Sequence, residues 1–387
     1  MWLAASSIYL AFLSLTDTWL FLYLALFLKA DPLTLGLASS LWSVIFVASN
    51  IFFGRFVEEG LNKTAALASS ALLCLAFFTT VNSRGVVEVV VGYSLLHSIS
   101  ASLGRSAFNV TLLEYVNYEA WSKYNYFFNY VTLSVRGLLL VLVYLELLSP
   151  TSLLLLTLSV SAVYAITLPP VVLPVERSLF RLAKQLDRVH TYMKFTSILP
   201  DVVDTGLTAS RALELRWSVE KEVASYKPLL GAFILVTSSD ALFIIVPRLI
   251  SSYIGREQTL LVYGISSLAS ALALVAISRV SKGRLTTLLS GLARALVIPL
   301  VTFIAGVEQA VAYLLTTAIL FNVFNTSSYN AYITSASGRR TFLYGVAVEL
   351  GSAVGSIVGG FLALYFGIEY VIVLSIMGHI VASIVAS

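Results

Sequence analysis

A single polar interval, residues 175–227, separates two long apolar halves of the sequence. The interval contains 16 of the 44 charged residues of the chain, nine of them basic and seven acidic. On either side of it, apolar runs follow one another with only short interruptions. A helix of about 20 apolar residues crosses the ~30 Å hydrocarbon core of a bilayer. This pattern predicts two groups of membrane-spanning helices joined by one polar tether.

The composition supports a membrane fold built from helices. Hydrophobic residues make up 58% of the chain and charged residues 11%, against roughly 45–50% and 25% in soluble domains. Backbone polar groups inside a bilayer must be satisfied internally, which leaves helices or closed barrels. Barrel strands give alternating segments of about ten residues, whereas the apolar runs here are continuous. The predicted fold class is an all-α membrane protein.

Twelve apolar runs are long enough to span a bilayer. Six precede the polar interval and six follow it, which predicts an N-terminal six-helix bundle at 1–174, an amphipathic tether at 175–227 and a C-terminal six-helix bundle at 228–387. The expected spans are residues 2–28, 33–54, 64–82, 86–110, 124–148, 151–174, 228–250, 258–278, 285–304, 308–330, 341–366 and 368–386.

The distribution of lysine and arginine predicts the orientation of the chain. If the N-terminus is cytoplasmic, the loops on that side contain 17 lysines and arginines, and the loops on the other side contain three. Both termini and the tether are therefore expected on the cytoplasmic side of a plasma membrane. The first span lacks the basic start and the small-residue cleavage site of a signal peptide, so we expect it to remain as a membrane helix.

The first part of the tether has the periodicity of an amphipathic helix. One face is apolar and another is basic: Leu179, Ala183, Leu186, Val189 and Met193 on the first, and Arg177, Arg181, Lys184 and Arg188 on the second. A basic amphipathic helix lies on anionic lipid headgroups, so membrane lipids are an expected partner. The alternative is an ordinary solvated linker.

The two halves resemble each other at a constant offset of 221 residues. Ser-Ala-Phe-Asn at 106–109 aligns with Ser-Ser-Tyr-Asn at 327–330, and the same offset pairs Lys63 with Arg284. Parallel six-helix repeats related by an axis along the membrane normal are one architecture of transporters. We therefore expect a pseudo-twofold relation between the two bundles.

Few residues of the chain are of the kinds that carry enzyme or metal chemistry. Cys74 is the only cysteine, and the three histidines, His97, His190 and His379, have no metal-ligand spacing. The sequence has no phosphate-binding glycine loop and no nucleophile motif. We expect a protein without enzymatic activity, metal, cofactor or nucleic-acid partner that acts as a monomer.

The loop between the second and third expected spans carries a motif of a known family. Gly54, Glu58 and Lys63 match three positions of the signature Gly-x-x-x-Asp/Glu-Arg-x-Gly-Arg-Arg/Lys of the major facilitator superfamily, and positions 59, 61 and 62 depart from it. With its twelve expected spans, its central tether and its orientation, the chain resembles this superfamily over nearly its whole length.

The resemblance implies a conformational latch at the cytoplasmic surface. In the family, the acid of this loop caps the start of the eleventh helix and stabilises the outward-facing state, which would be the role of Glu58. Glu114, at the cytoplasmic end of the fourth expected span, matches an acid that acts as its partner. Gly283 and Arg284 are what the equivalent loop of the second half retains.

Three glycines form a stripe in the eleventh expected span. Gly351, Gly355 and Gly359 recur at every fourth position. Small residues at this spacing let a neighbouring helix approach closely, and packing rather than hydrophobicity drives helix association in lipid. We expect a helix-packing surface here.

Two acidic residues lie deep within expected spans. Asp17 is roughly 22 Å from the cytoplasmic end of the first span, and Asp240 is roughly 18 Å from that of the seventh. A charge at such depth requires a partner or a role. By the resemblance, both helices line a central cavity, so both acids are candidates for proton coupling or substrate contact. The alternative is that an intramembrane arginine neutralises each acid and only holds helices together.

Other ionisable residues within the spans complete the candidate site. Arg136, near the middle of the fifth span, is a candidate to bind a carboxylate or phosphate, or to pair with one of the two acids. Arg105 is a candidate gate residue that alternatively reaches the interface, and Glu349 is a candidate second proton site or arginine partner. We expect Arg294 and His97 to be packing residues.

The sequence thus predicts a secondary active transporter that moves a small organic solute by alternating access. Coupling to protons is expected because the spans offer carboxylates and the chain has no nucleotide-binding motif. Two alternatives stay open, namely an uncoupled facilitator and a non-transporting membrane sensor or partner subunit with the same fold.

Overall fold

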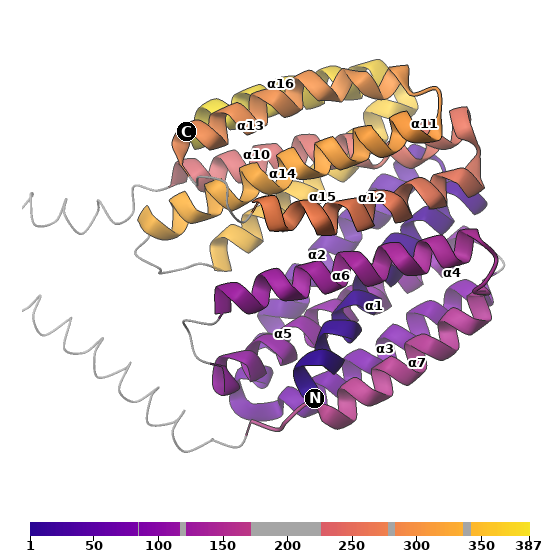
Figure 1. Cartoon of the computed structure of the whole chain (residues 1–387), viewed down its shortest axis with the longest axis vertical. Helices are drawn as coiled ribbons and strands as arrows, with labels where there is room; N and C mark the ends of the chain where they lie inside the picture. Colours follow the sequence, from indigo (N-terminus) through magenta and orange to yellow (C-terminus); the bar gives the residue numbers. More distant parts are fainter. Residues whose placement is uncertain (84, 117–120, 172–225, 278–282, 336–341) are drawn as a thin grey trace, which may run out of the picture.

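A computed structural model describes residues 1–83, 85–116, 121–171, 226–277, 283–335 and 342–387, and all regular structure in these ranges is helical (Figure 1). The predicted tether, 175–227, lies outside the described residues except for its last two positions, which begin a helix.

The described residues up to 171 form seven α-helices with three short π-helical segments between or after them. In chain order these are α1 (Trp2–Leu22), η1 (Tyr23–Phe27), α2 (Pro32–Phe56), η2 (Val57–Leu61), α3 (Asn62–Val81), α4 (Val86–Val91), η3 (Gly92–His97), α5 (Ser98–Tyr115), α6 (Trp121–Tyr144) and α7 (Pro150–Thr167). We refer to them as the first half.

The described residues from 226 onwards form a second half of seven α-helices and one 3-10 segment. In chain order these are α10 (Tyr226–Phe243), α11 (Val246–Ile254), α12 (Arg256–Ile277), α13 (Arg284–Val297), η5 (Ile298–Phe303), α14 (Val307–Ser335), α15 (Phe342–Tyr365) and α16 (Ile368–Ala386).

Eleven helical segments among the described residues are long and apolar enough to cross a membrane. α12, with 22 residues, is a further long helix at the place of the eighth expected span, 258–278, whose last residue lies outside the described part. A helix therefore coincides with every one of the predicted apolar runs. The chain has the architecture of an all-helical, multi-pass membrane protein.

Prolines move several helix ends away from the positions that the apolar pattern predicts. The seventh expected span, 228–250, is two helices, because Pro247 has no N–H to donate and occupies the first turn of α11. The sixth, 151–174, ends as a helix at Thr167, two residues before Pro169, because a proline disfavours the helical conformation in the residue that precedes it.

Asp31 caps the start of α2. Its carboxylate accepts hydrogen bonds from the Thr34 N–H at 2.9 Å and from the Thr34 hydroxyl at 2.5 Å. Partial burial disfavours the charged form, but these hydrogen bonds outweigh it and hold the pKa of Asp31 below its ordinary value. The cap is therefore charged at neutral pH and fixes the turn that leads into α2.

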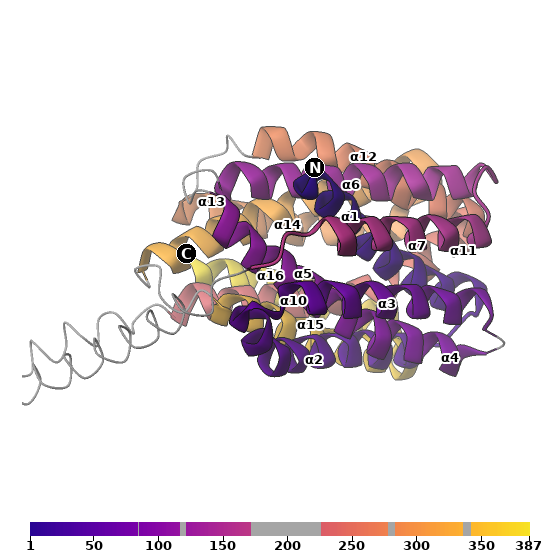
Figure 2. The same cartoon turned by 90° about the horizontal axis from the view of Figure 1, so that it is seen from below.

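Two helix pairs join the halves. Most helices pack within their own half, while α2 packs along α15 and α6 packs along α12 across the boundary (Figures 1 and 2). We call these pairs the two seams. Glycines make both possible, since a Cβ at Gly360 would lie 2.5 Å from the Pro32 carbonyl oxygen and one at Gly137 would lie 2.7 Å from that of Gly264.

The buried apolar core is shared between the halves at one end of the molecule. The start of α10 and the C-terminus lie toward the left in Figure 1, and the chain leaves α7 toward the same side; we call this side the terminal end and the opposite side the far end. Toward the far end, one buried cluster contains residues of both halves, and the rings of Phe21 and Phe243 stack with centroids 5.0 Å apart. Toward the terminal end, each cluster of described residues belongs to one half alone.

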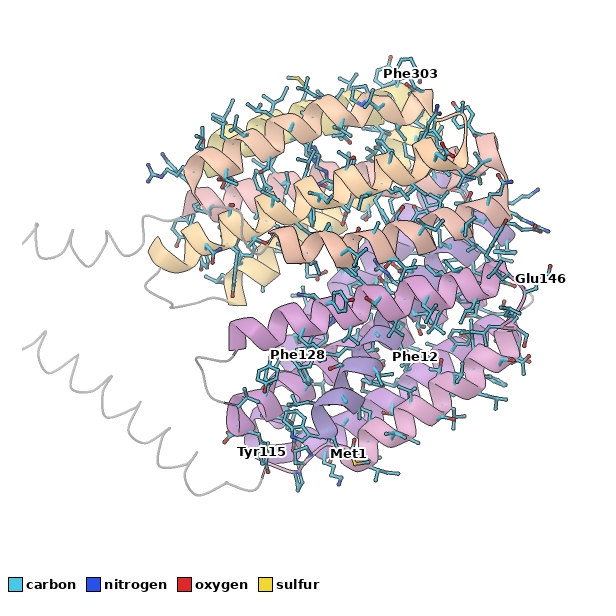
Figure 3. All side chains as sticks on the ribbon, in the orientation of Figure 1. Met1, Phe12, Tyr115, Phe128, Glu146 and Phe303 are labelled. Carbon is cyan, nitrogen blue, oxygen red and sulfur yellow. The ribbon has the colours of Figure 1, made fainter. Side chains whose placement is uncertain are left out.

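Side chains divide clearly between interior and periphery. Phe12 lies inside the helical bundle and Phe303 projects from its edge (Figure 3), in agreement with exposures of 4% and 73%. A periphery of large apolar side chains is what a lipid-facing surface requires.

Candidate functional site

Three carboxylates that the sequence singles out come together from three helices. Asp17 on α1, Asp240 on α10 and Glu349 on α15 interact electrostatically with one another, and all three interact with the buried phenol of Tyr93 on η3. Two of these helices belong to the second half and one to the first. We call the three residues the carboxylate cluster.

Asp17 is partly exposed although it lies within a span. Its side chain is 43% exposed, in a helix that is long enough to cross a membrane. Among the described residues, no arginine nitrogen lies within 4.0 Å of a carboxylate of the cluster. This conformation therefore does not show the direct ion pairs of the purely structural alternative. Carboxylates without a fixed cation are able to exchange protons or to contact a polar solute.

Each member of the cluster has one arginine as an electrostatic neighbour. Arg136 accompanies Asp17, Arg294 accompanies Asp240, and Arg105 accompanies Glu349. An arginine within electrostatic range reduces the cost of placing a carboxylate at this depth.

Arg136 ties three helices together. Its Nε donates to the Ser267 hydroxyl on α12 at 3.0 Å, and its Nη1 donates to the Ser14 hydroxyl on α1 at 3.2 Å. Ser267 in turn donates to the Leu133 carbonyl on α6 at 2.9 Å. The planar guanidinium therefore bridges the α6–α12 seam and the helix that carries Asp17.

We expect Arg136→Lys to lower the free energy of unfolding by about 1.5–3 kcal/mol, because a lysine keeps the charge but cannot donate to both serines from one fixed fork. Thermal unfolding in detergent measures this. Arg284→Lys is the matched control, since Arg284 is exposed at the first residue of α13. Equal losses of stability in both variants would contradict the bridging role.

The other two arginines are held by hydroxyl and aromatic groups. Arg294 donates from Nη1 to the Ser239 hydroxyl at 2.8 Å and lies 4.8 Å from the centre of the Phe321 ring. Its buried Nε has no hydrogen-bond partner among the described residues. Arg105 lies 5.5 Å from the centre of the Phe46 ring. Arg294 makes the packing contacts expected from the sequence, but it also lies beside Asp240, which the sequence does not reveal.

His97 is enclosed and fully hydrogen-bonded, as expected for a packing histidine. It is 1% exposed; Nδ1 accepts from the Trp42 indole at 2.9 Å, and Nε2 lies 2.9 Å from the Leu13 carbonyl oxygen. The same Nδ1 lies 4.0 Å from an oxygen of Asp17, so the ring also borders the carboxylate cluster.

The predicted latch is described only in part. The side chain of Glu58 and the residues just before α15 lie outside the described part. Lys63 donates to the Ile166 carbonyl of α7 at 3.5 Å. The remaining members lie at helix ends: Gly54, Glu114, Gly283 and Arg284. The latch stays a prediction.

The glycine stripe of α15 lies against α10. A Cβ at Gly351 would lie 2.7 Å from the Phe233 carbonyl oxygen, and one at Gly355 would lie 2.8 Å from the Thr237 Cα. Gly359 stands equally close to the backbone of α10. α10 and α15, which carry Asp240 and Glu349, therefore pack backbone against backbone along this stripe.

Several neighbours of the cluster have no distinctive sequence signal. Tyr93 and Trp42 are aromatic residues within apolar runs, where such residues are ordinarily packing side chains. Ser43 lies near Glu349, and Ser352 lies near Asp240. Serines are frequent throughout these spans, so neither position stands out in the sequence.

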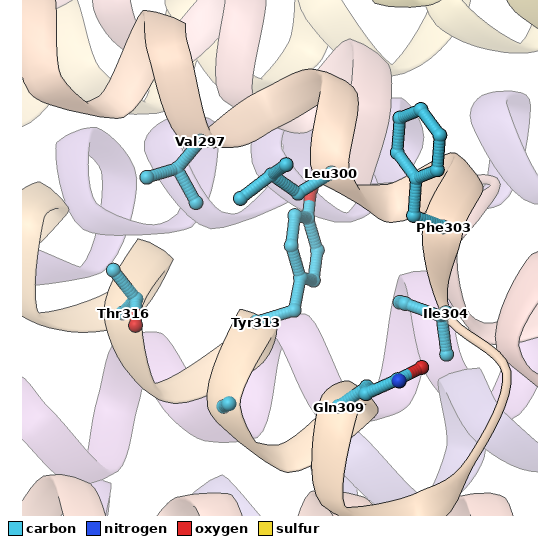
Figure 4. Close-up of a pocket in the computed structure, with 8 residues that line it drawn as sticks. Val297, Leu300, Phe303, Ile304, Gln309, Tyr313 and Thr316 are labelled. Carbon is cyan, nitrogen blue, oxygen red and sulfur yellow. The ribbon is translucent and has the colours of Figure 1, made fainter.

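A separate pocket of about 350 Å³ lies between α13, η5 and α14 (Figure 4). Its lining is mostly apolar and includes none of the carboxylates or arginines described above. Leu300 and Phe303, at its edge, are 52% and 73% exposed. Within the described residues, no group of three or more His, Cys, Asp or Glu side chains is arranged to hold a metal ion. The carboxylate cluster is therefore the candidate site.

Comparison with known protein families finds no match, and comparison with curated proteins finds none either. Among solved structures, the crystal structure of a POT family transporter in complex with a thioalcohol-conjugated peptide matches with a TM-score of 0.64. The match covers 99% of this chain and 94% of that chain at 13% sequence identity. The two chains share a fold. At this identity the likeness concerns architecture alone.

Proposed function

We propose that this protein is a secondary transporter of the major facilitator type that moves a small organic solute across a plasma membrane, coupled to protons. The observation that carries the proposal is the carboxylate cluster: Asp17 is partly exposed within a span, and no arginine nitrogen of the described residues lies within 4.0 Å of the three acids. The fold shared with a solved transporter supports it. Glu349 and Asp240 serve as further proton or solute contacts, and Arg105 and Arg136 as contacts for an anionic part of the solute.

Alternating access is supported by the uneven joining of the halves. A common apolar core at the far end and separate cores at the terminal end are the features of one of two alternating states. In the opposite state, the seams would rock and the terminal end would close. With the predicted orientation, the end at which the cores are separate would face the cytoplasm.

The two seams support a six-plus-six repeat. If the halves correspond in chain order, the second span corresponds to the eighth and the fifth to the eleventh. The α2–α15 seam joins the second span to the eleventh, and the α12–α6 seam joins the eighth to the fifth. A twofold relation exchanges these pairs, as parallel repeats require. The tether at 175–227, with its lipid-facing basic helix, would allow the two bundles to move relative to each other. The protein would act as a monomer.

Flux measurements in proteoliposomes test the proposal. Radiolabelled dialanine, alanine, lactate and tetraethylammonium serve as probes, with dialanine first because the matched structure contains a peptide conjugate. With the membrane potential clamped at zero, an imposed pH difference of one unit is expected to drive accumulation of at least one probe, and a protonophore to abolish it. Liposomes without protein are the control.

Other outcomes identify the alternatives. Equilibration that ignores the pH difference would identify an uncoupled facilitator. Absence of flux for every chemical class of probe, with folded protein, would favour the sensor or partner subunit.

A further inference from the structure

The hydrogen bonds around His97 determine its tautomer. An indole N–H donates and never accepts, so Nδ1, which faces the Trp42 indole at 2.9 Å, carries a lone pair. A backbone carbonyl only accepts, so Nε2, at 2.9 Å from the Leu13 oxygen, carries the proton. The ring is neutral in this arrangement, with its one acceptor position occupied by Trp42.

Asp17 is the exposed partner of this acceptor. The Asp17 carboxylate is 43% exposed and lies 4.0 Å from Nδ1, whereas the imidazole is 1% exposed. The charged groups that interact with the ring are Asp17 on α1 and Arg105 on α5, and Tyr93 of its own segment stacks 6.4 Å away. From α2, Trp42 contacts the imidazole ring. Among the described residues, α3 and α4 contribute no charged group that interacts with the ring.

We propose that Asp17 and His97 together form the proton-binding site of the transport cycle. Trp42 is a positioning residue whose hydrogen bond depends on the protonation state of His97. A proton from water enters at an Asp17 oxygen and passes to the lone pair of Nδ1. Because both ring nitrogens then carry protons, the Trp42 N–H loses its acceptor. The imidazolium donates to the carboxylate of Asp17, which is ionised again, and keeps its bond to Leu13. This inference rests on the proposed function.

Trp42 connects the proton site to a seam between the halves. It lies on α2, three residues after Ser39, whose hydroxyl accepts a hydrogen bond at 3.1 Å from Ser356 on α15. The next residue, Ser43, is a neighbour of Glu349. The face of α2 that holds the neutral imidazole is therefore continuous with the face that packs on the second half. Loss of the Trp42 bond on protonation would act at this boundary.

Nitrogen-15 NMR of the full chain in lipid nanodiscs, labelled at histidine and tryptophan, tests the proton site without any solute. The His97 signals are assigned by their loss in His97→Gln. Between pH 9 and pH 4 we expect conversion from the Nε2–H tautomer to the doubly protonated ring, with a simultaneous change in one indole signal that Trp42→Phe removes. A ring that stays neutral throughout this range would overturn the proposal, whether or not the protein transports.

Two variants should move the midpoint of that conversion in opposite directions. Trp42→Phe removes a bond that only the neutral ring makes, so the midpoint should rise by about 0.5–1 pH unit. Asp17→Asn removes the partner of the charged ring, so the midpoint should fall. His379→Gln is the matched control, because His379 is also buried and bonds Ser375 and Ser239; it should leave the midpoint unchanged. If Trp42→Phe and Asp17→Asn shift the midpoint of the His97 titration in the same direction, the proposed arrangement of hydrogen bonds around His97 is wrong.

Flux separates this inference from the proposed function. In His97→Gln, proton-driven accumulation should be lost while exchange of labelled for unlabelled probe persists. Retention of proton-driven accumulation in this variant would overturn the assignment of His97 and leave the transporter proposal intact. Absence of flux in the wild-type protein would count against the transporter proposal, and the NMR titration would still decide whether His97 takes a proton.

Discussion

Asp17→Asn should abolish proton-driven accumulation of solute while exchange across the membrane continues. An asparagine keeps the size and hydrogen-bonding capacity of the side chain but cannot take up a proton. For one coupled proton, a pH difference of one unit supports an accumulation ratio of about ten, because one unit corresponds to a tenfold change in equilibrium. The variant should reach a ratio of about one. Uptake and exchange in the same proteoliposomes measure the two quantities.

Asp31→Asn provides the matched control for this substitution. Asp31 is exposed at the start of α2 and acts as a helix cap, a role that asparagine fills equally well. This variant should keep the wild-type accumulation ratio. If Asp17→Asn accumulates solute as well as Asp31→Asn does, Asp17 is not part of the coupling mechanism.

Gly355→Ala should strongly destabilise the protein. The added Cβ would lie 2.8 Å from both the Cα and the carbonyl carbon of Thr237, with the Thr237 carbonyl oxygen nearer still. These are backbone atoms of α10, which move only if the whole helix moves. Overpacking of this kind costs about 1–3 kcal/mol. The helices that must move carry Asp240 and Glu349, so both the thermal unfolding midpoint and solute flux should fall.

Gly345→Ala, on the same helix, is the control for this prediction. A Cβ at Gly345 would meet no atom within 4 Å, and alanine favours the helical state over glycine by about 1 kcal/mol. The unfolding midpoint of this variant should therefore stay level or rise. Equal behaviour of Gly345→Ala and Gly355→Ala would mean that the stripe of α15 does not form the close contact described above.

Much of the fold follows from the sequence because lipid imposes a simple rule. Every backbone polar group within the bilayer must be bonded internally, so each long apolar run forms a helix, as the described residues confirm. Local chemistry shifted the boundaries. Pro247 divides the seventh expected span, and Pro169 follows the early end of the sixth. These prolines are visible in the sequence, but hydropathy averages over them.

The sequence predicts the charged residues of the candidate site, but it does not predict the uncharged residues that surround them. Asp17, Asp240 and Glu349 stand out because an ionisable residue within an apolar run is costly. Tyr93 and Trp42 do not stand out, because aromatic residues are common packing side chains in apolar runs. Arg294 was expected to pack, and only its hydrogen bond to Ser239 on α10 shows that it also lies near Asp240.

The sequence by itself determined that this chain forms membrane helices and which of their residues carry charge at depth, because hydrophobic length and the cost of buried charge are properties of each segment alone. Only the tertiary structure decided which helices meet, that three carboxylates from α1, α10 and α15 share one site, and that His97 holds its acceptor nitrogen between Trp42 and Asp17. Those relations depend on crossings between segments up to 332 residues apart, such as Asp17 and Glu349. Side-chain packing and close glycine contacts fix these crossings, and hydropathy does not encode them.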